Sequence, residues 1–486
     1  MFRCRLLVIT VFLGLGISDL LMGAQLLLKE RMLRSYLRSG VPQFDKAFLQ
    51  KSEAEAAQSL YNDQFATGLF YAADVAESDD PRESIWSKQH SIGVKQALPW
   101  GVKGGLSYVY RNERFGAFFP PPYGLTEYHL PYLALSLEVD LWKNVIGTQD
   151  RVKEDYLKSI VNQSTINKKL QDNQLYNTLR GLYWRIVAQD RRIQIFRELV
   201  NTAKRSYRNM LSRQRDSIAD KGAVAEMAAN LSSAEANYRK SRIDRNFLER
   251  DLKILVPSLQ PYDLRMADSY AQVRRAVDES VQCSKKVGRM SSIPYDFTEY
   301  DELIRKIDQT LQFKKQELDN HAAPDVSLSL VGRSFGLSQE FSEAAEQPFG
   351  SDKTAYSAVL SLNVPIGSPY RTEKQLINNE SLGAAIQRTQ LAARYKAAHS
   401  NLQKNFTPLA EAVKLYHKSI YDQEEAFKST QRKFRQGRIS VFDFIGSQNT
   451  LLNSKLQVIG LEERLILEML DYFNIFNLAP CSFNRK

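Results

Sequence analysis

The residue types that most often carry chemistry are sparse in this chain, which has five histidines and three cysteines among 486 residues. No two of the histidines have the spacing of paired metal ligands on one helix, as in H-E-x-x-H. Two cysteines, Cys283 and Cys481, lie far apart in the sequence, and whether they form a disulfide stays open. We therefore expect no metal site. The histidines are His90, His129, His321, His399 and His417.

Motifs for nucleophilic or phosphate chemistry are also missing from the sequence. It contains no G-x-S-x-G elbow, no P-loop and no C-x-x-C pair. Gly14 and Gly16 belong to an apolar N-terminal stretch, and Gly101, Gly104 and Gly105 fall between candidate strands. We expect no catalytic residue and no cofactor, so the chain is not expected to be an enzyme.

The N-terminus has the pattern of a secretory signal peptide. Arg3 and Arg5 precede an apolar stretch from Leu6 to Ile17, and Gly23 with Ala24 offers a cleavage point. The alternative is a membrane anchor, but the stretch is shorter than the ~20 residues that a spanning helix needs. The pattern predicts that residues 1–24 are removed on export.

The formal charge of +11 raises the question of a nucleic-acid partner. Between Arg185 and Lys221 the chain has ten Lys or Arg against four Asp or Glu. On a long helix such a run is typical of a solvated face, and an exported protein meets little nucleic acid. We expect no nucleic-acid binding; a basic helical nucleic-acid binder would require that residues 1–24 do not direct export.

The secondary-structure elements that would position any functional residues are unusually long helices. No proline occurs between Pro131 and Pro257, and apolar residues recur at helical spacing over residues 147–213. At ~1.5 Å per residue this helix would be on the order of 100 Å long. A second helix is expected over residues 223–255, after a break at Gly222.

The second half repeats this order. A helix over residues 370–435 is followed by Gly437 and a shorter helix over residues 442–476, and the two glycines Gly222 and Gly437 lie 215 positions apart. The recurrence indicates an internal duplication. Both glycines are expected at tight helix-turn tips, since such turns use backbone angles that glycine adopts at low cost. Pro408 should bend the second long helix.

Each long helix follows a β region. Residues 133–141 alternate strictly between an apolar and a polar face, and residues 326–330 and 356–364 do so as well; further candidates are residues 86–98 and 102–111. A soluble sheet alternates in the same way. If the strands cross a membrane, about four per chain cannot close a useful pore, so several copies must share one barrel.

Two stretches resemble the TolC-like outer membrane factor family. One is Phe434-Arg-Gln-Gly-Arg-Ile-Ser-Val-Phe-Asp-Phe-Ile445, which resembles the tip of the helical region; the other is Leu362-Asn-Val-Pro-Ile366, where Pro365 marks a strand-to-helix junction. The resemblance implies an α+β fold of long antiparallel α-helical barrel segments and transmembrane β-barrel strands, internally duplicated and completed by trimerisation. Three copies would give a twelve-stranded barrel.

The resemblance also implies a function and a location. It implies an outer membrane channel subunit of a tripartite efflux or type I secretion system, in a Gram-negative-type cell and extending into the periplasm. Its partners would be two other copies, outer-membrane lipid, a periplasmic adaptor and an inner-membrane transporter. The alternative is an exported periplasmic coiled-coil structural or adaptor protein without a pore.

For the closed periplasmic aperture, the resemblance points to Phe434, Arg438 and Asp443. Ile439 occupies the family's arginine position with Arg438 adjacent, and Gly446 occupies a second acidic position. Three symmetry-related Asp443 carboxylates would favour cations. The alternative is that Asp443 only complements the dipole in the first turn of its helix.

The expected organisation follows the chain in eight segments. These are a signal peptide (1–24), an N-terminal periplasmic helix (25–62), a first set of barrel strands (63–146), a first long helical pair (147–256), a linker region with a helix (257–323), a second pair of barrel strands (324–366), a second long helical pair (367–477) and a tail (478–486).

Overall fold

The computed structural model describes residues 25–37, 40–77, 84–115, 127–287, 299–321, 323–350, 353–364 and 369–476. The expected signal peptide (1–24), the tail (478–486) and Pro365 lie outside these ranges, as does Cys481. The chain divides into two compact units. The first unit comprises residues 1–49, 167–302 and 390–486, and the second comprises residues 50–166 and 303–389.

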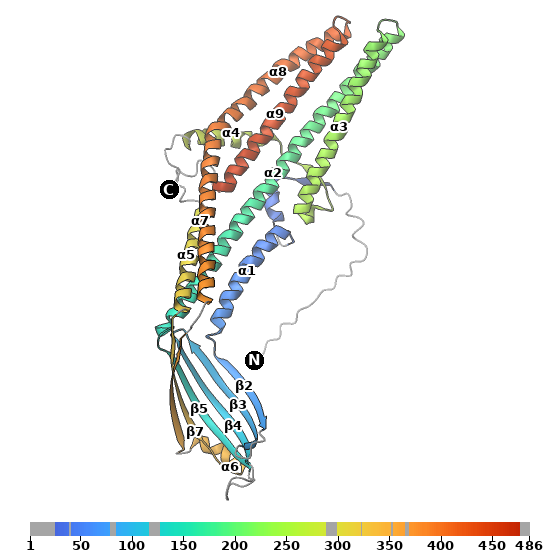
Figure 1. Cartoon of the computed structure of the whole chain (residues 1–486). Coiled ribbons are helices and arrows are strands. Elements are labelled where there is room, and N and C mark those ends of the chain that lie inside the picture. The colour runs from blue at the N-terminus through green and yellow to red at the C-terminus, as the bar shows by residue number, and fades with distance from the viewer. Residues whose placement is uncertain are drawn as a thin grey trace, which may run out of the picture. The chain divides into compact units, whose positions relative to one another are not determined.

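The second unit contains a six-stranded antiparallel sheet in the order β2-β3-β4-β5-β7-β8 (Figure 1). Every neighbouring pair is antiparallel. The strands are β2 Gly68–Glu77, β3 Ser84–Leu98, β4 Val102–Phe115, β5 Glu127–Asp140, β7 Asp325–Phe335 and β8 Thr354–Asn363.

The sheet has one apolar and one largely polar face, because side chains alternate along each strand and paired residues share a face. Leu135 pairs with Leu106, and Ser136 pairs with Gly105. The apolar face carries exposed side chains from all six strands: Leu69, Tyr71, Val75, Ile92, Val94, Leu106, Leu135, Leu137, Leu330, Tyr356, Leu360 and Leu362.

The estimate of about four strands per chain is wrong, since the described part of the chain has six in this sheet. The strand that the sequence did not predict is β2. Phe70, Ala72 and Ala76 are apolar residues on its polar face, so its alternation is weaker than that of β5. Pairing with β3 along all ten residues compensates, because backbone hydrogen bonds do not depend on side-chain type.

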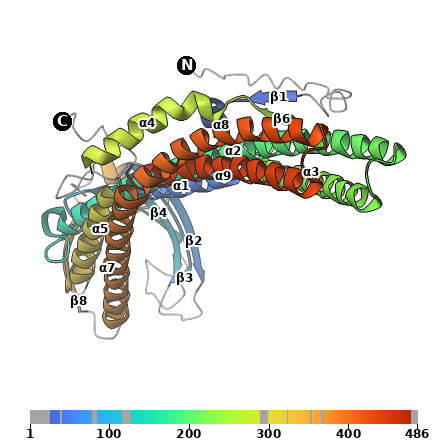
Figure 2. The same ribbon diagram turned by 90° about the horizontal axis from the view of Figure 1, so that it is seen from above.

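Two helical hairpins dominate the first unit. In both views α2 runs beside α3, and α8 runs beside α9 (Figures 1 and 2). The long helix expected over residues 147–213 runs from Thr148 to Arg215.

The helices of both units, in the described part of the chain, are α1 Pro42–Asp63, α2 Thr148–Arg215, α3 Lys221–Leu255, α4 Tyr270–Val287, α5 Glu299–His321, α6 Phe341–Glu346, α7 Pro369–Asn401, α8 Thr407–Arg435 and α9 Val441–Phe476.

The second long helix is interrupted before Pro408. A π-helical segment, Leu402–Phe406, separates α7 from α8, and Pro408 lies in the first turn of α8. A proline lacks the N–H that would bond to the carbonyl four residues earlier, and a π-helical turn absorbs this loss. At the position where a bend was predicted from Pro408, the structure thus shows a change of helix type.

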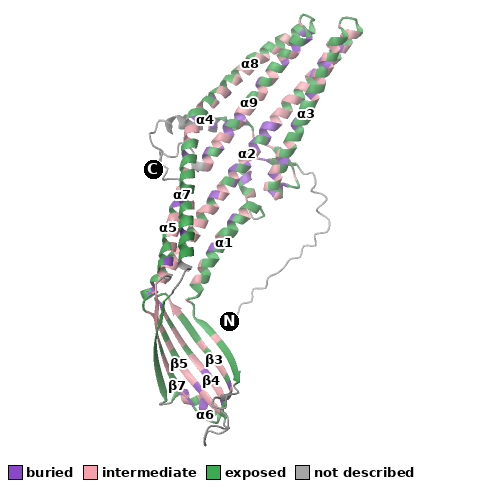
Figure 3. Ribbon diagram, in the orientation of Figure 1, coloured by how far each residue is buried: buried purple, intermediate pink, exposed green. Residues whose placement is uncertain are grey.

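The core of the first unit is built mainly from α2 and α9, with buried residues from α3, α4, α8 and the N-terminal segment. Figure 3 shows buried residues along α2 and α9. Strand β1, Gln25–Leu28, pairs in parallel with β6, Asp263–Met266. Leu28 and Leu33 are fully buried beside Tyr183, whose hydroxyl donates to the Leu28 carbonyl at 3.1 Å. The beginning of the described chain is thus part of the core.

Among the described residues, no helix combines the length and the apolar character that crossing a bilayer requires.

Candidate functional site

The candidate site is the pair of turns that closes the two helical hairpins. One turn joins α2 to α3 and the other joins α8 to α9. In the second turn Gly437 has φ +72°, the left-handed region that L side chains rarely adopt, and its N–H donates to the Phe434 carbonyl. In the first turn Ser217 has φ +60° and donates to the Gln214 carbonyl in the same way.

The turn role predicted for Gly222 is wrong. The structural counterpart of Gly437 is Ser217, so the two turns repeat after 220 residues instead of 215. Gly222 lies in the first turn of α3, after the N-cap Asp220. Because the left-handed residue of the first turn is a serine, the spacing between glycines gives the wrong length for the repeat. With this repeat the counterpart of Asp443 in the first turn is Ala223, which is uncharged.

A small apolar cluster, here called the tip cluster, holds the two turns together. It comprises the buried residues Met210, Met227, Phe434, Val441 and Phe444. The rings of Phe434 and Phe444 stack with centroids 4.4 Å apart and an interplanar angle of 14°. Phe444 is fully buried. Of these residues only Phe434 was predicted from the sequence to belong to the site.

Asp443 is engaged within its own turn. Ser440 Oγ donates to Asp443 Oδ2 at 2.7 Å, and the Asp443 N–H donates back to Ser440 Oγ at 3.1 Å. This reciprocal arrangement satisfies N–H groups at the start of α9, as in a capping box. The carboxylate remains exposed to solvent. Asp443 lies in the first turn of α9, the position that the dipole alternative assumed, and the hydrogen bonds with Ser440 add a capping role that the sequence did not predict. Its charge stays accessible.

Arginine side chains lie at both turns. Arg438 is exposed, and among the described residues it has no ion-pair partner. Arg213 lies over the Phe434 ring, 5.8 Å from its centroid, and donates a hydrogen bond to the Arg435 carbonyl, which links α2 to the end of α8. The two turns thus carry exposed positive charge, and the stacked rings of Phe434 and Phe444 hold the second turn in place. The two turns contain no nucleophile paired with a base.

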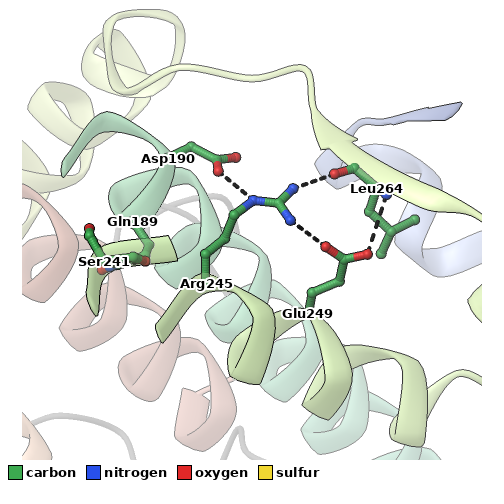
Figure 4. A network of polar contacts seen from close by, with 6 residues as sticks. All are labelled: Gln189, Asp190, Ser241, Arg245, Glu249 and Leu264. Atoms are coloured by element: carbon green, nitrogen blue, oxygen red, sulfur yellow. Dashed lines mark hydrogen bonds and ion pairs between the residues drawn. The ribbon is translucent and has the colours of Figure 1, made fainter. Parts of the chain in front are cut away.

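A partly buried polar network joins the two helices of the first hairpin (Figure 4). Arg245 Nε donates to Asp190 Oδ1 at 2.7 Å, and its guanidinium also donates to Glu249 and to the Leu264 carbonyl. Lys253 Nζ lies 2.7 Å from Glu249 Oε1. These contacts fix α3 against α2 and β6.

The network perturbs the acidity of its two carboxyl groups in opposite directions. Burial raises the pKa of Asp190, although Arg245 opposes the rise. Burial also acts to raise the pKa of Glu249, but the hydrogen bond from Lys253 and the charge of Arg245 outweigh it, so this pKa is lowered. Glu249 thus favours its charged form in the folded protein.

Three of the histidines contact a polar neighbour. His90 contacts the Tyr71 hydroxyl at 2.8 Å, His129 contacts Tyr110, and His417 Nε2 lies 2.8 Å from Glu462. Among the described residues no group of three or more His, Cys, Asp or Glu could hold a metal ion. Pro365 and the pairing of Cys283 with Cys481 fall outside what the structure describes.

Comparison with known proteins shows the fold. No family model matches the sequence, and no curated protein matches it. Among solved structures, the outer membrane protein VceC of Vibrio cholerae matches with a TM-score of 0.64 at 12% identity, covering 92% of this chain and 95% of that one. The CmeC outer membrane channel of Campylobacter jejuni matches with 0.64 at 12% identity, covering 92% and 85%.

A third match is the open state of the MtrE outer membrane channel of Neisseria gonorrhoeae. Its TM-score is 0.62 at 12% identity, covering 93% of this chain and 89% of that one. These likenesses confirm the predicted fold class, in which long antiparallel helices are combined with an antiparallel sheet.

Proposed function

We propose that this chain, which has the fold of TolC-like outer membrane channels, is the subunit of a passive export channel in the outer membrane of a Gram-negative-type cell. Three copies assemble around one pore that extends into the periplasm. A periplasmic adaptor and an inner-membrane transporter supply the substrate and the energy, in efflux or in type I secretion.

The observation that carries the proposal is the exposed apolar face of the six-stranded sheet. Its side chains stay in solvent in the single chain; Leu69 is 84% exposed and Tyr356 83%. Soluble proteins rarely expose a contiguous apolar surface that crosses a whole sheet. Lipid is the environment that such a face fits, since outer-membrane strands alternate between lipid and an aqueous lumen.

The opposite face supports a water-filled interior. It carries small and polar side chains such as Ser107, Ser136 and Ser329, together with an ion pair between Lys103 and Glu138 at 2.9 Å. Charged pairs on a lipid-facing surface would be costly, whereas a lumen hydrates them. The strands of 10 to 15 residues meet the length of about 9 to 11 that a spanning strand needs.

The turns of the two hairpins supply the periplasmic aperture in this proposal. Phe434 holds the second turn in place through its stack on Phe444, and Arg438 and Asp443 present charge to the pore or to the adaptor. Around a threefold axis, three Asp443 carboxylates would attract cations.

Purified oligomer in planar bilayers tests the proposal. We expect discrete ion conductance, an oligomer mass of three chains, detergent-dependent extraction and heat-modifiable migration on gels. A protein that is released without detergent and never permeabilises liposomes would instead be the periplasmic coiled-coil protein without a pore.

Export is tested separately. Residues 1–24 fused to a reporter should direct its secretion. Retention of the reporter in the cytoplasm would contradict the proposed location.

A further inference from the structure

The inference concerns the two edges of the six-stranded sheet and rests on the proposed function. We infer that β2 of one copy pairs with β8 of the next, so that three copies close an eighteen-stranded barrel. The twelve strands expected from the family resemblance would be too few for this chain.

The first argument is the condition of the edge strands. All ten residues of β8 are exposed, as are nine of the ten in β2. Soluble proteins protect an edge with prolines, bulges, lysines or very short strands. Neither edge has these features: both strands are ten residues long, neither contains a proline or a lysine, and each pairs in continuous register with its neighbour. In a bilayer such edges must be paired.

The second argument is direction. Because each of the five neighbouring pairs is antiparallel, β2 and β8 run in opposite directions. A contact between β8 of one copy and β2 of the next is therefore antiparallel too. Three copies of six strands then close with every pair antiparallel and an even total, as bacterial outer-membrane barrels do.

The third argument is that β2 continues the apolar face of the sheet, as a strand of the barrel wall would. If the β2–β3 hairpin lay outside a twelve-stranded barrel, its apolar face would not need to continue that of β4 and β5. The register shows that it does: Tyr71 pairs with Ile92, Ile92 with Tyr108, and Tyr108 with Leu133. One apolar surface thus runs from one edge strand to the other.

The consequence is a wider outer pore. Barrel diameter grows roughly linearly with strand number, so eighteen strands give a diameter about 1.5-fold that of twelve. The membrane segment would then pass solutes that a twelve-stranded barrel excludes.

Disulfide trapping between copies tests the pairing. In a chain whose native cysteines are replaced by serine, Ala73→Cys in β2 is combined in turn with a cysteine at Tyr356, Ala358, Leu360 or Leu362 of β8. These positions share the apolar face. The matched control moves the first cysteine to Leu106 of β4 and keeps the β8 series.

We expect at least one β2 combination to give covalently linked copies and the β4 series to give none. Two cysteines must lie within about 7 Å between Cα atoms, and β4 would be three strand spacings, about 14 Å, from β8 of the next copy. Electron microscopy of the same oligomer should show the wider barrel. Linkage through β4 alone, in an oligomer that still conducts, would overturn the inference and leave the channel intact. An oligomer that does not conduct would overturn the proposed function itself.

Discussion

At the scale of single residues, Phe444 fixes the conformation of the second turn. Its ring is 0% exposed and stacks on Phe434, whereas Phe442, two positions earlier, is 69% exposed. We expect Phe444→Ala to destabilise the tip by about 3–5 kcal/mol, because it leaves a cavity, and Phe442→Ala to cost under about 0.5 kcal/mol. Hydrogen exchange across residues 430–450 measures this difference. Equal protection in both variants would show that the tip cluster does not hold the turn.

The charge of Asp443 can be separated from its capping role. Asp443→Ala removes both, while Ser440→Ala removes the hydroxyl that receives and donates the capping hydrogen bonds and keeps the carboxylate. Each should weaken the start of α9 by about 1 kcal/mol. Only Asp443→Ala should alter conductance or cation block in reconstituted channels. Unchanged behaviour in both measurements would remove Asp443 from the aperture.

Arg245 is the residue that connects the partly buried polar network. Arg245→Met keeps much of the side-chain volume but leaves Asp190 and Glu249 without their shared cation, so we expect a loss of about 3–5 kcal/mol. In the same helix, Arg250 pairs with Asp251 at the surface, where side chains are 62% and 48% exposed. Arg250→Met should cost under about 1 kcal/mol. Denaturant unfolding compares the two, and equal losses would contradict a special role for Arg245.

At the scale of elements, the two faces of β5 predict opposite responses to one substitution. Leu135 is 63% exposed on the apolar face, and Ser136 points to the opposite face. Leu135→Lys should oppose membrane assembly by about 2–4 kcal/mol, because a lysine at the bilayer midplane loses its hydration, whereas Ser136→Lys should assemble normally. The yield of heat-modifiable oligomer measures both. Similar yields would mean that this face does not meet lipid.

The elements differ in how far the sequence predicts them. The helix of 68 residues from Thr148 to Arg215 was predictable, because its apolar residues keep helical spacing without a proline. Strand β2 was missed because Phe70 and Ala72 on its polar face weaken its alternation, and its stability comes from pairing with β3. Burial of Phe444 depends on contacts between two hairpins that are more than 200 residues apart in the sequence, so no local pattern reveals it.

The wrong prediction for Gly222 is explained by the residue types that the two turns use. Glycine spacing suggested Gly222, but the left-handed residue is Ser217. The caps of the two turns were more regular than the glycines: Asp220 accepts from the Ala223 N–H at 2.6 Å, and Ser440 occupies the equivalent position. Cap residues would therefore have given the repeat of 220 positions directly.

At the scale of the whole molecule, different forces stabilise the two units. The first unit has a buried core of aliphatic and aromatic side chains with ionic contacts inside it. The second unit leaves the apolar face of its sheet uncovered in the single chain. Removing detergent should therefore lower the stability of the second unit. Changing the protonation of carboxyl groups should change the stability of the first unit.

The acid response of the first unit follows from the opposite shifts of Glu249 and Asp190. Since the folded-state pKa of Glu249 is lowered, its contribution is present above its unfolded pKa of about 4.3 and is lost as the pH falls through the folded value. The pKa of Asp190 is raised, so its charged form costs stability that returns as the pH falls. Glu249→Gln should consequently flatten the loss of stability between about pH 6 and 3, and Asp190→Asn should steepen it. Unfolding of α2 and α3, followed by hydrogen exchange across that range with detergent constant, measures both slopes. Slopes that change in the same direction would show that the two carboxyl groups do not titrate as the network requires.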